Sequence, residues 1–153
     1  MEHKSQKRHK ALQSLSREHH QGLLLSWKIR AGLNKNIDAK RIWHYANWFF
    51  ETHLIPHFDM EETHVFPILD DGNKLKKKAM AEHRRLKRLF SDTNTQATTL
   101  GKIEEELEQH IRFEERVLFP EIQKIASQEQ LALIEDIHKQ DDFIENLDDQ
   151  FWN

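Results

Sequence analysis

The sequence predicts an all-α protein: an up-down-up-down four-helix bundle with an extra C-terminal helix. Two observations favour this fold class. Of the 153 residues, 32% are charged and 37% are hydrophobic, with only four Gly and three Pro, a composition typical of amphipathic helices. Apolar residues also recur at helical spacing in four long segments joined by short links, as in an antiparallel bundle.

The first helix is expected over about 12–33, where the apolar residues follow the helical period. Gly32 and the Asn-Lys-Asn run at 34–36 are expected to end it. Asp38 is a good N-cap for a second helix that runs to about Leu69. Pro56 interrupts this helix, which predicts a kink just before His57.

Three further helices are expected after a turn at 70–72. The third covers about 74–91 behind Asn73 as a cap, and the fourth runs from about Thr99 to Ala126. The fifth spans 128–149, opened by a capping box that begins at Ser127. The chain is therefore divided into a flexible basic N-terminus (1–11), a four-helix bundle (12–126) and a C-terminal helix packed on it (127–153).

Composition excludes several classes of protein. The net charge is −3, so a dedicated nucleic-acid binder is not expected. No apolar run reaches about eighteen residues, so no membrane span is expected. The N-terminus has no apolar segment behind its charges, so it does not resemble a secretory signal, and a cytoplasmic protein is expected.

One motif occurs twice and carries most of the functional information. It consists of a His, two Glu four and five residues later, and a Phe-Pro pair. Because residues four apart lie on one helical face, each copy can aim an imidazole and a carboxylate at the same point. The two copies are His57-Phe-Asp-Met-Glu61-Glu62-Thr-His-Val-Phe66-Pro67 and His110-Ile-Arg-Phe-Glu114-Glu115-Arg-Val-Leu-Phe119-Pro120.

A Glu-His pair precedes each copy of the motif. Glu82-His83 precedes the second copy, and Glu18-His19 precedes the first. His20 is the alternative to His19 in the first helix, but the repeat and the apolar stripe favour His19. The chain therefore contains two helix pairs that together supply a ligand set for two metal ions: His19 (or His20), His57, Glu61, His83, His110 and Glu114.

The absence of cysteine restricts the kind of metal centre. Without thiolates, any metal must be held by nitrogen and oxygen ligands, which suit iron, manganese, zinc or copper. Glu61 and Glu114 are the candidates to bridge two cations, with the imidazoles as terminal ligands. Glu62 and Glu115 point about 100° away and are expected to orient imidazoles or to face solvent, whereas His53 is expected to be a core histidine.

The His-x-x-x-Glu spacing with Glu-His pairs between resembles the hemerythrin-like family, also called HHE cation-binding domains. The resemblance covers about residues 12–125, and HIRFEERVLFP is its most specific stretch. It implies two iron ions in a non-haem, oxo- or hydroxo-bridged centre that binds O2 or another small oxidant. Oxygen carriers of the family have a second His where this chain has Lys87, and an Asp one residue beyond the position of Glu114.

Three functions remain open from the sequence. The first is a di-iron protein that binds or senses O2, small oxidants or iron. The second is a di-iron enzyme that handles peroxide or nitric oxide, or repairs iron centres. The third is a metal-free or zinc-holding interaction bundle, in which the basic third helix or the fifth helix contacts a protein partner or a second copy of the chain.

Overall fold

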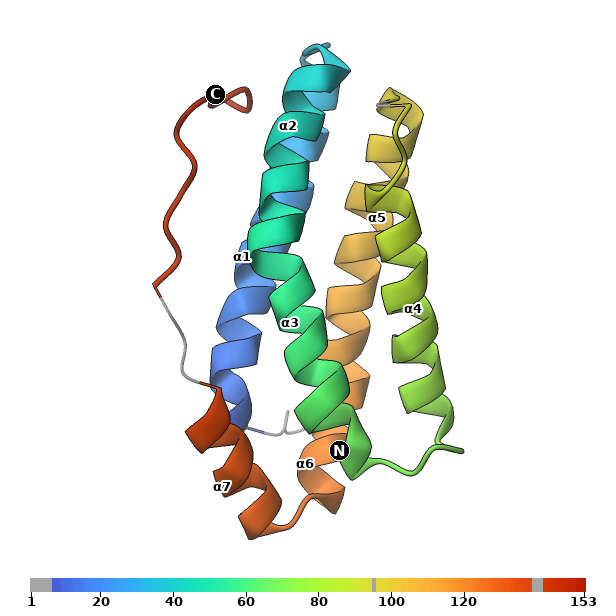
Figure 1. The fold of residues 1–153 in the computed structure, drawn as a ribbon, viewed down its shortest axis with the longest axis vertical. Coiled ribbons are helices and arrows are strands. Elements are labelled where there is room, and N and C mark those ends of the chain that lie inside the picture. Colours follow the sequence, from blue (N-terminus) through green and yellow to red (C-terminus); the bar gives the residue numbers. More distant parts are fainter. Residues whose placement is uncertain (1–6, 95, 139–141) are drawn as a thin grey trace, which may run out of the picture.

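The computed structural model describes residues 7–94, 96–138 and 142–153, and these residues form an all-α bundle with an extra helix (Figure 1). The predicted fold class is confirmed. Within the described ranges there is no strand, and no helix is long and apolar enough to cross a membrane. Predictions for residues 1–6 and 139–141 concern positions outside these ranges.

Four helical columns run alternately up and down the bundle (Figure 1). The first is α1 (Lys10–Asn34), and the third is α4 (Lys74–Phe90). The second is built in series from α2 (Ala39–Phe49), η1 (Phe50–Leu54), α3 (Ile55–Met60), η2 (Glu61–Val65) and η3 (Phe66–Ile68). The fourth is built from α5 (Ala97–Phe113), η4 (Glu114–Leu118) and α6 (Phe119–Ile125), and the extra helix is α7 (Gln128–Ile137).

Side-chain caps fix where the helices begin. The Asp38 carboxylate accepts a hydrogen bond from Lys40 N, and the Asn73 side chain accepts from Leu75 N and Lys76 N. Ser127 forms the expected capping box with Gln130 at the start of α7. Each cap satisfies backbone N–H groups that have no partner inside the helix, so local sequence determines these boundaries.

Each of the three prolines follows a π-helical turn. η1 ends two residues before Pro56, η2 two residues before Pro67, and η4 two residues before Pro120. Proline has no N–H to donate and its ring clashes with the carbonyl four residues back, and a wider turn accommodates both effects. The predicted interruption before His57 is therefore a π turn within a continuous helical column.

Two apolar clusters fill the bundle, one toward each end. The upper cluster contains Ile29, Phe49 and Ile103, and the lower one contains Leu12, Phe66 and Phe119. Phe66 and Phe119 belong to the two Phe-Pro pairs and are fully buried. The repeated His and Glu residues lie between the two clusters along every column, so a polar layer separates two dry regions of core.

The expected fifth helix is shorter than predicted. The helix ends at Ile137, and residues 142–153 return along α1 and α2 in non-helical conformation (Figure 1). We call residues 142–153 the C-terminal strap. The Asn146 side chain accepts a hydrogen bond from Asp148 N, and a local bond of this kind competes with the backbone bonds of a helix.

Polar contacts fasten the strap to the bundle. The buried Lys28 ammonium lies 2.8 Å from the Tyr45 hydroxyl and 2.5 Å from Glu145 of the strap. It also lies 4.4 Å from the centre of the Trp152 ring. These contacts compensate the cost of burying an ammonium group, and they tie the strap to α1 and α2 together.

Apolar packing adds to this attachment. Phe151 is 1% exposed and packs on α1 at Gly32, where a Cβ would lie 2.8 Å from its ring. A side chain at this position would have to displace the Phe151 ring and the Ile42 side chain, which would lie 2.9 Å from the same Cβ. The strap therefore completes the upper core, whereas the sequence predicted a helix over 128–149 packed on the bundle.

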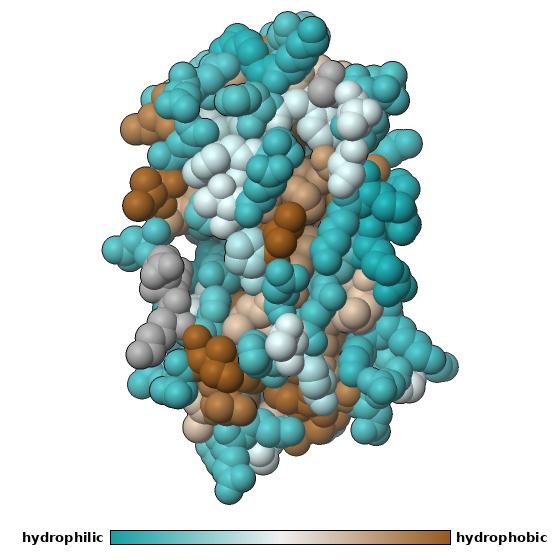
Figure 2. Space-filling model, in the orientation of Figure 1, coloured by the Kyte–Doolittle hydropathy of each residue, from teal (hydrophilic) through white to brown (hydrophobic). Residues whose placement is uncertain are grey.

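The surface over α4 is hydrophilic (Figure 2). Part of its basic charge is paired, as in the contacts of Lys76 with Asp71, of Lys78 with Glu82 and of Arg85 with Glu106. Exposed pairs of this kind contribute little to stability, but they give α4 a solvated face.

Phe151→Ala should lower the free energy of unfolding by about 3–5 kcal/mol, because it removes a buried aromatic ring and leaves a cavity. Ile144→Ala is the matched control on the same strap, since Ile144 is 78% exposed. Urea unfolding followed by circular dichroism would measure both changes. Equal stability of the two variants would contradict the role given to Phe151.

Candidate metal centre

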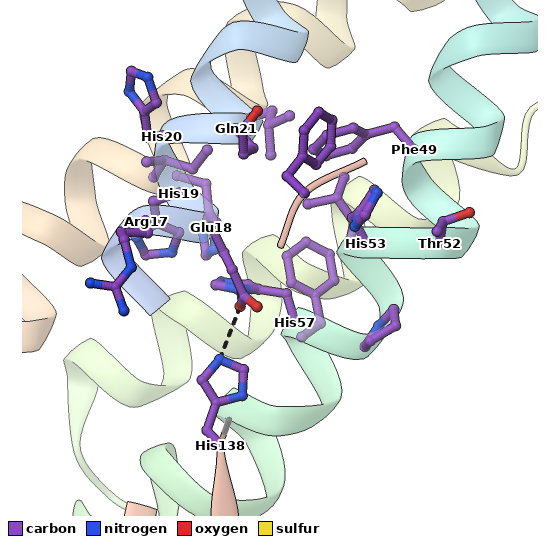
Figure 3. Close-up of a pocket in the computed structure, with 18 of the residues that line it drawn as sticks. Arg17, Glu18, His19, His20, Gln21, Phe49, Thr52, His53, His57 and His138 are labelled. Atoms are coloured by element: carbon purple, nitrogen blue, oxygen red, sulfur yellow. Dashed lines mark hydrogen bonds and ion pairs between the residues drawn. The ribbon is translucent and has the colours of Figure 1, made fainter. Parts of the chain in front are cut away.

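The six residues predicted as ligands come together in the middle of the bundle. All are buried, and Glu61 and Glu114 are completely inaccessible to solvent. His19 faces this cluster, whereas His20 is exposed and its ring points away (Figure 3). The structure therefore places His19, and not its neighbour, beside the other candidates.

The cluster divides into two groups that share both carboxylates. One group contains His19 and His57 together with Glu61 and Glu114, and the other contains His83 and His110 with the same two carboxylates. Within each group, one ligand atom from each residue lies within 4.8 Å of all the others. Carboxylates shared in this way can bridge two cations.

His19 Nε2 and Glu114 Oε1 lie 2.8 Å apart at the centre of the cluster. The other polar atoms that face the centre lack hydrogen-bond partners. They are Nε2 of His57, His83 and His110, both carboxylate oxygens of Glu61, and Oε2 of Glu114. Buried polar atoms without partners are costly, so each such atom needs an explanation. Nitrogen and oxygen atoms that converge without partners fit a cation of the iron, manganese or zinc type.

Each of the four imidazoles is hydrogen-bonded to a carboxylate on the side that faces away from the cluster. Every Nδ1 donates a hydrogen bond 2.7 Å long to a Glu, so every Nε2 is left to face the cluster. The pairs are His19 with Glu115, His57 with Glu18, His83 with Glu62, and His110 with Glu82.

These contacts account for both Glu residues in each repeat. Glu62 and Glu115 orient imidazoles, which is one of the roles expected for them, and neither belongs to the two groups. Sequence reasoning missed the roles of Glu18 and Glu82. The available signal was their position, since each precedes a histidine at the same point of the repeat.

We call the four carboxylates that accept hydrogen bonds from the imidazoles the outer carboxylates. Three of them lie close to an Arg or Lys side chain. Glu115 lies 3.6 Å from Arg8, Glu82 lies 2.5 Å from Lys78, and Glu62 lies 3.9 Å from Lys87. Glu18 instead lies 3.3 Å from His138, at the end of α7 (Figure 3). The arrangement around the cluster is thus symmetric except where the C-terminal region meets it.

Electrostatic coupling shifts the protonation of the whole cluster. Burial by itself would lower the pKa of His57, but the carboxylates of Glu61 and Glu18 raise this pKa to about 9. Burial would raise the pKa of Glu18, but its contacts with His138 and His57 lower this pKa to about 2. Burial alone would also lower the pKa of His19 and of His83. Their contacts with carboxylates, of which the one with Glu114 is the strongest, instead raise both pKa values well above 6.5.

These shifts describe a cluster in which protons on imidazoles balance carboxylate charge. A cation of higher charge can replace those protons, because a metal binds only the neutral imidazole and the ionised carboxylate. The site can therefore exchange protons for metal without leaving the carboxylates uncompensated.

Aromatic rings close one side of the cluster. The Phe58 ring stacks on His83 with ring centroids 3.9 Å apart, and Phe66 lies 5.3 Å from the same imidazole. On another side, Phe119 stacks on His19 at 5.2 Å. These contacts hold the imidazoles in place and exclude water around them.

A cavity of about 730 Å³ adjoins the cluster. Its wall includes His19 and His57 (Figure 3), and also His110 and Phe58. His53 also lines this cavity, packed among Trp48, Phe49 and Phe143. It belongs to neither ligand group, but it is only half-buried and its Nε2 has no hydrogen-bond partner, so it is not the core histidine that was expected.

Comparison with family models gives a match to the hemerythrin HHE cation-binding domain over residues 74–151. The matched residues contain the second Glu-His pair and the second copy of the motif. Searches of curated proteins and of solved structures found no match.

The metal-free protein should be most stable between pH 4.5 and 6.5. The lowered pKa of Glu18 stabilises the fold above 4.5, and this contribution is lost as the pH falls toward 2. The raised pKa of His57 stabilises the fold below 6.5, and this contribution is lost as the pH rises through 9. Thermal melts in chelator would show the maximum, and a constant Tm from pH 6.5 to 9 would contradict it.

Glu62→Ala should weaken metal binding by about 10–100-fold, because the His83 ring loses the carboxylate that fixes its orientation. Competition against a coloured chelator would measure the affinity. Glu51→Ala is the control, since Glu51 also lies in a π turn of the second column but is exposed. Equal affinity of the two variants would show that Glu62 has no positioning role.

Proposed function

Because the chain belongs to the hemerythrin HHE cation-binding family, we propose that its central cluster holds two iron ions and presents them to O2 or another small oxidant. Residues 12–126 would form the binding unit, with ligands from all four columns. The family match begins at α4, but the same motif in the first half of the chain contributes an equal share of the cluster.

The observation that carries this proposal is the sharing of Glu61 and Glu114 by two groups of potential ligands. One carboxylate that serves two cations fixes their separation and offsets part of their mutual repulsion. His19 and His57 would be terminal ligands of one ion, and His83 and His110 of the other. Four protein ligands for each ion leave room for small molecules.

The donor set favours iron over softer alternatives. Imidazole and carboxylate ligands suit iron, manganese and zinc, whereas the absence of thiolate disfavours copper(I) and iron–sulfur clusters. Two shared carboxylates give a paired site, unlike the closed tetrahedral arrangement of a structural zinc ion. Bound iron would supply an open coordination position and a redox couple.

The protein contributes orientation and exclusion of water. The carboxylates behind the imidazoles fix which ring nitrogen faces the ions, and Phe58, Phe66 and Phe119 keep the layer dry. The cavity beside His57 gives a small oxidant a route to one side of the centre. Binding, sensing and turnover all need these properties.

Glu114→Ala should lose most of the bound iron while the bundle still folds, because Glu114 belongs to both ligand groups. Elemental analysis of protein expressed with iron and purified without chelator would measure the loss. Glu105→Ala is the control, since Glu105 is exposed on the same helical column.

The wild-type protein should contain about two irons per chain by this proposal and absorb visible light. Circular dichroism would show whether the Glu114 variant keeps its helices. Full iron occupancy in Glu114→Ala would remove this residue from the centre, and a colourless wild-type protein holding zinc would favour the interaction bundle instead.

A further inference from the structure

The cavity beside the cluster is much larger than a diatomic oxidant requires. Its volume of about 730 Å³ falls within the range of roughly 300–1,000 Å³ that is common for sites of organic ligands. Its wall combines the imidazoles of the candidate centre with a set of apolar side chains. The shape therefore suits a molecule with a polar head and an apolar body.

The apolar part of the wall is built from three structural elements of the bundle and from the strap. Leu107 and Ile111 come from α5, and Phe58 comes from α3. Phe49, at the end of α2, and Phe143 of the strap meet at a tilt with ring centroids 6.1 Å apart, and the His53 ring packs against both. Aromatic walls favour an aromatic occupant, because flat rings pack well against one another.

Only one side of the cluster is open to this cavity. His19, His57 and His110 line it, whereas His83 is 1% exposed and is covered by Phe58. Glu61 is fully buried beneath the imidazoles. Both imidazoles assigned to one ion, His19 and His57, line the cavity, whereas only His110 of the other pair does, so a ligand in the cavity is better placed to reach the ion at His19 and His57.

The mouth of the cavity is polar and carries both signs of charge. His20 and Thr52 lie at its rim, and Glu18 is paired there with His138 (Figure 3). Such a mouth is wetted by solvent, whereas the deeper wall is mostly apolar. Glu18 also bonds to His57 at 2.7 Å, so the charged part of the wall adjoins the imidazoles directly, and the apolar side chains form a separate part of the wall.

We propose that this cavity binds an aromatic organic ligand whose nitrogen or oxygen donor reaches the ion at His19 and His57 while its ring lies against Phe49, Phe58 and Phe143. This inference rests on the proposed function, since the donor needs a bound cation. Phe143 is then a specificity-determining residue, because the strap supplies it to an otherwise helical wall.

The test uses the cobalt(II)-loaded protein and two probes, imidazole and 4-phenylimidazole, which share a donor and differ by one aromatic ring. Cobalt content by elemental analysis first tests the site itself. The visible bands of cobalt then report binding of either probe without any redox reaction. We expect 4-phenylimidazole to bind at least about tenfold more tightly, because its ring leaves water for the apolar wall.

Two variants locate the ring of the probe. Phe143→Ala should reduce the tighter binding toward the affinity of imidazole. Leu107→Trp, at a fully buried position beside the cavity, should abolish it in protein that circular dichroism shows to be folded. Phe143 is only partly buried where it packs on the upper cluster, and circular dichroism would check that its truncation leaves the helices folded. Trp27→Ala is the control, since Trp27 is 50% exposed and lies outside the cavity.

The outcomes separate the two proposals. Cobalt uptake with equal affinity for both probes, or with an advantage for 4-phenylimidazole that survives both cavity variants, would overturn the ligand inference and leave the metal centre standing. Failure to take up cobalt would overturn both. Tighter binding of 4-phenylimidazole that both cavity variants diminish, and that Trp27→Ala preserves, would establish the inference.

Discussion

Two ionised carboxylates buried at the centre of a helical bundle are the constraint around which the other groups are arranged. Glu61 and Glu114 have no access to water, so neighbouring groups must balance their charge. Four imidazoles do so, and each is itself held by a further carboxylate. The apolar clusters above and below then serve a second purpose, because they keep this polar layer fixed and dry.

Proline and the π turns place those carboxylates. The π turns η2 and η4 begin at Glu61 and Glu114, and a proline follows each turn. A π turn inserts an extra residue into the helical repeat, which changes the direction of the side chains beyond it. The Phe-Pro pair of the motif therefore belongs to the geometry of the site as well as to the packing of the core.

The centre is nearly symmetric, but its surroundings are not. Three of the outer carboxylates meet Arg or Lys, while Glu18 meets His138 from the C-terminal region. The cavity lies on that same side, and the strap supplies part of its wall through Phe143. The repeated motif explains why the candidate ligands form two similar groups. The C-terminal region has no counterpart in the repeat, and the cavity lies on the side of the centre where this region packs.

The four helical columns, the caps at Asp38 and Asn73, and the six residues of the cluster could be predicted from the sequence, because helical period and the duplicated motif are local signals. The sequence already favoured His19 over His20. Two features required the folded chain: the contacts of Glu18 and Glu82 with imidazoles, and the end of the last helix at Ile137. These features depend on contacts between columns. The strap is the clearest case, since Phe151 lies at Gly32, more than a hundred residues away in the chain, and no local pattern encodes that contact.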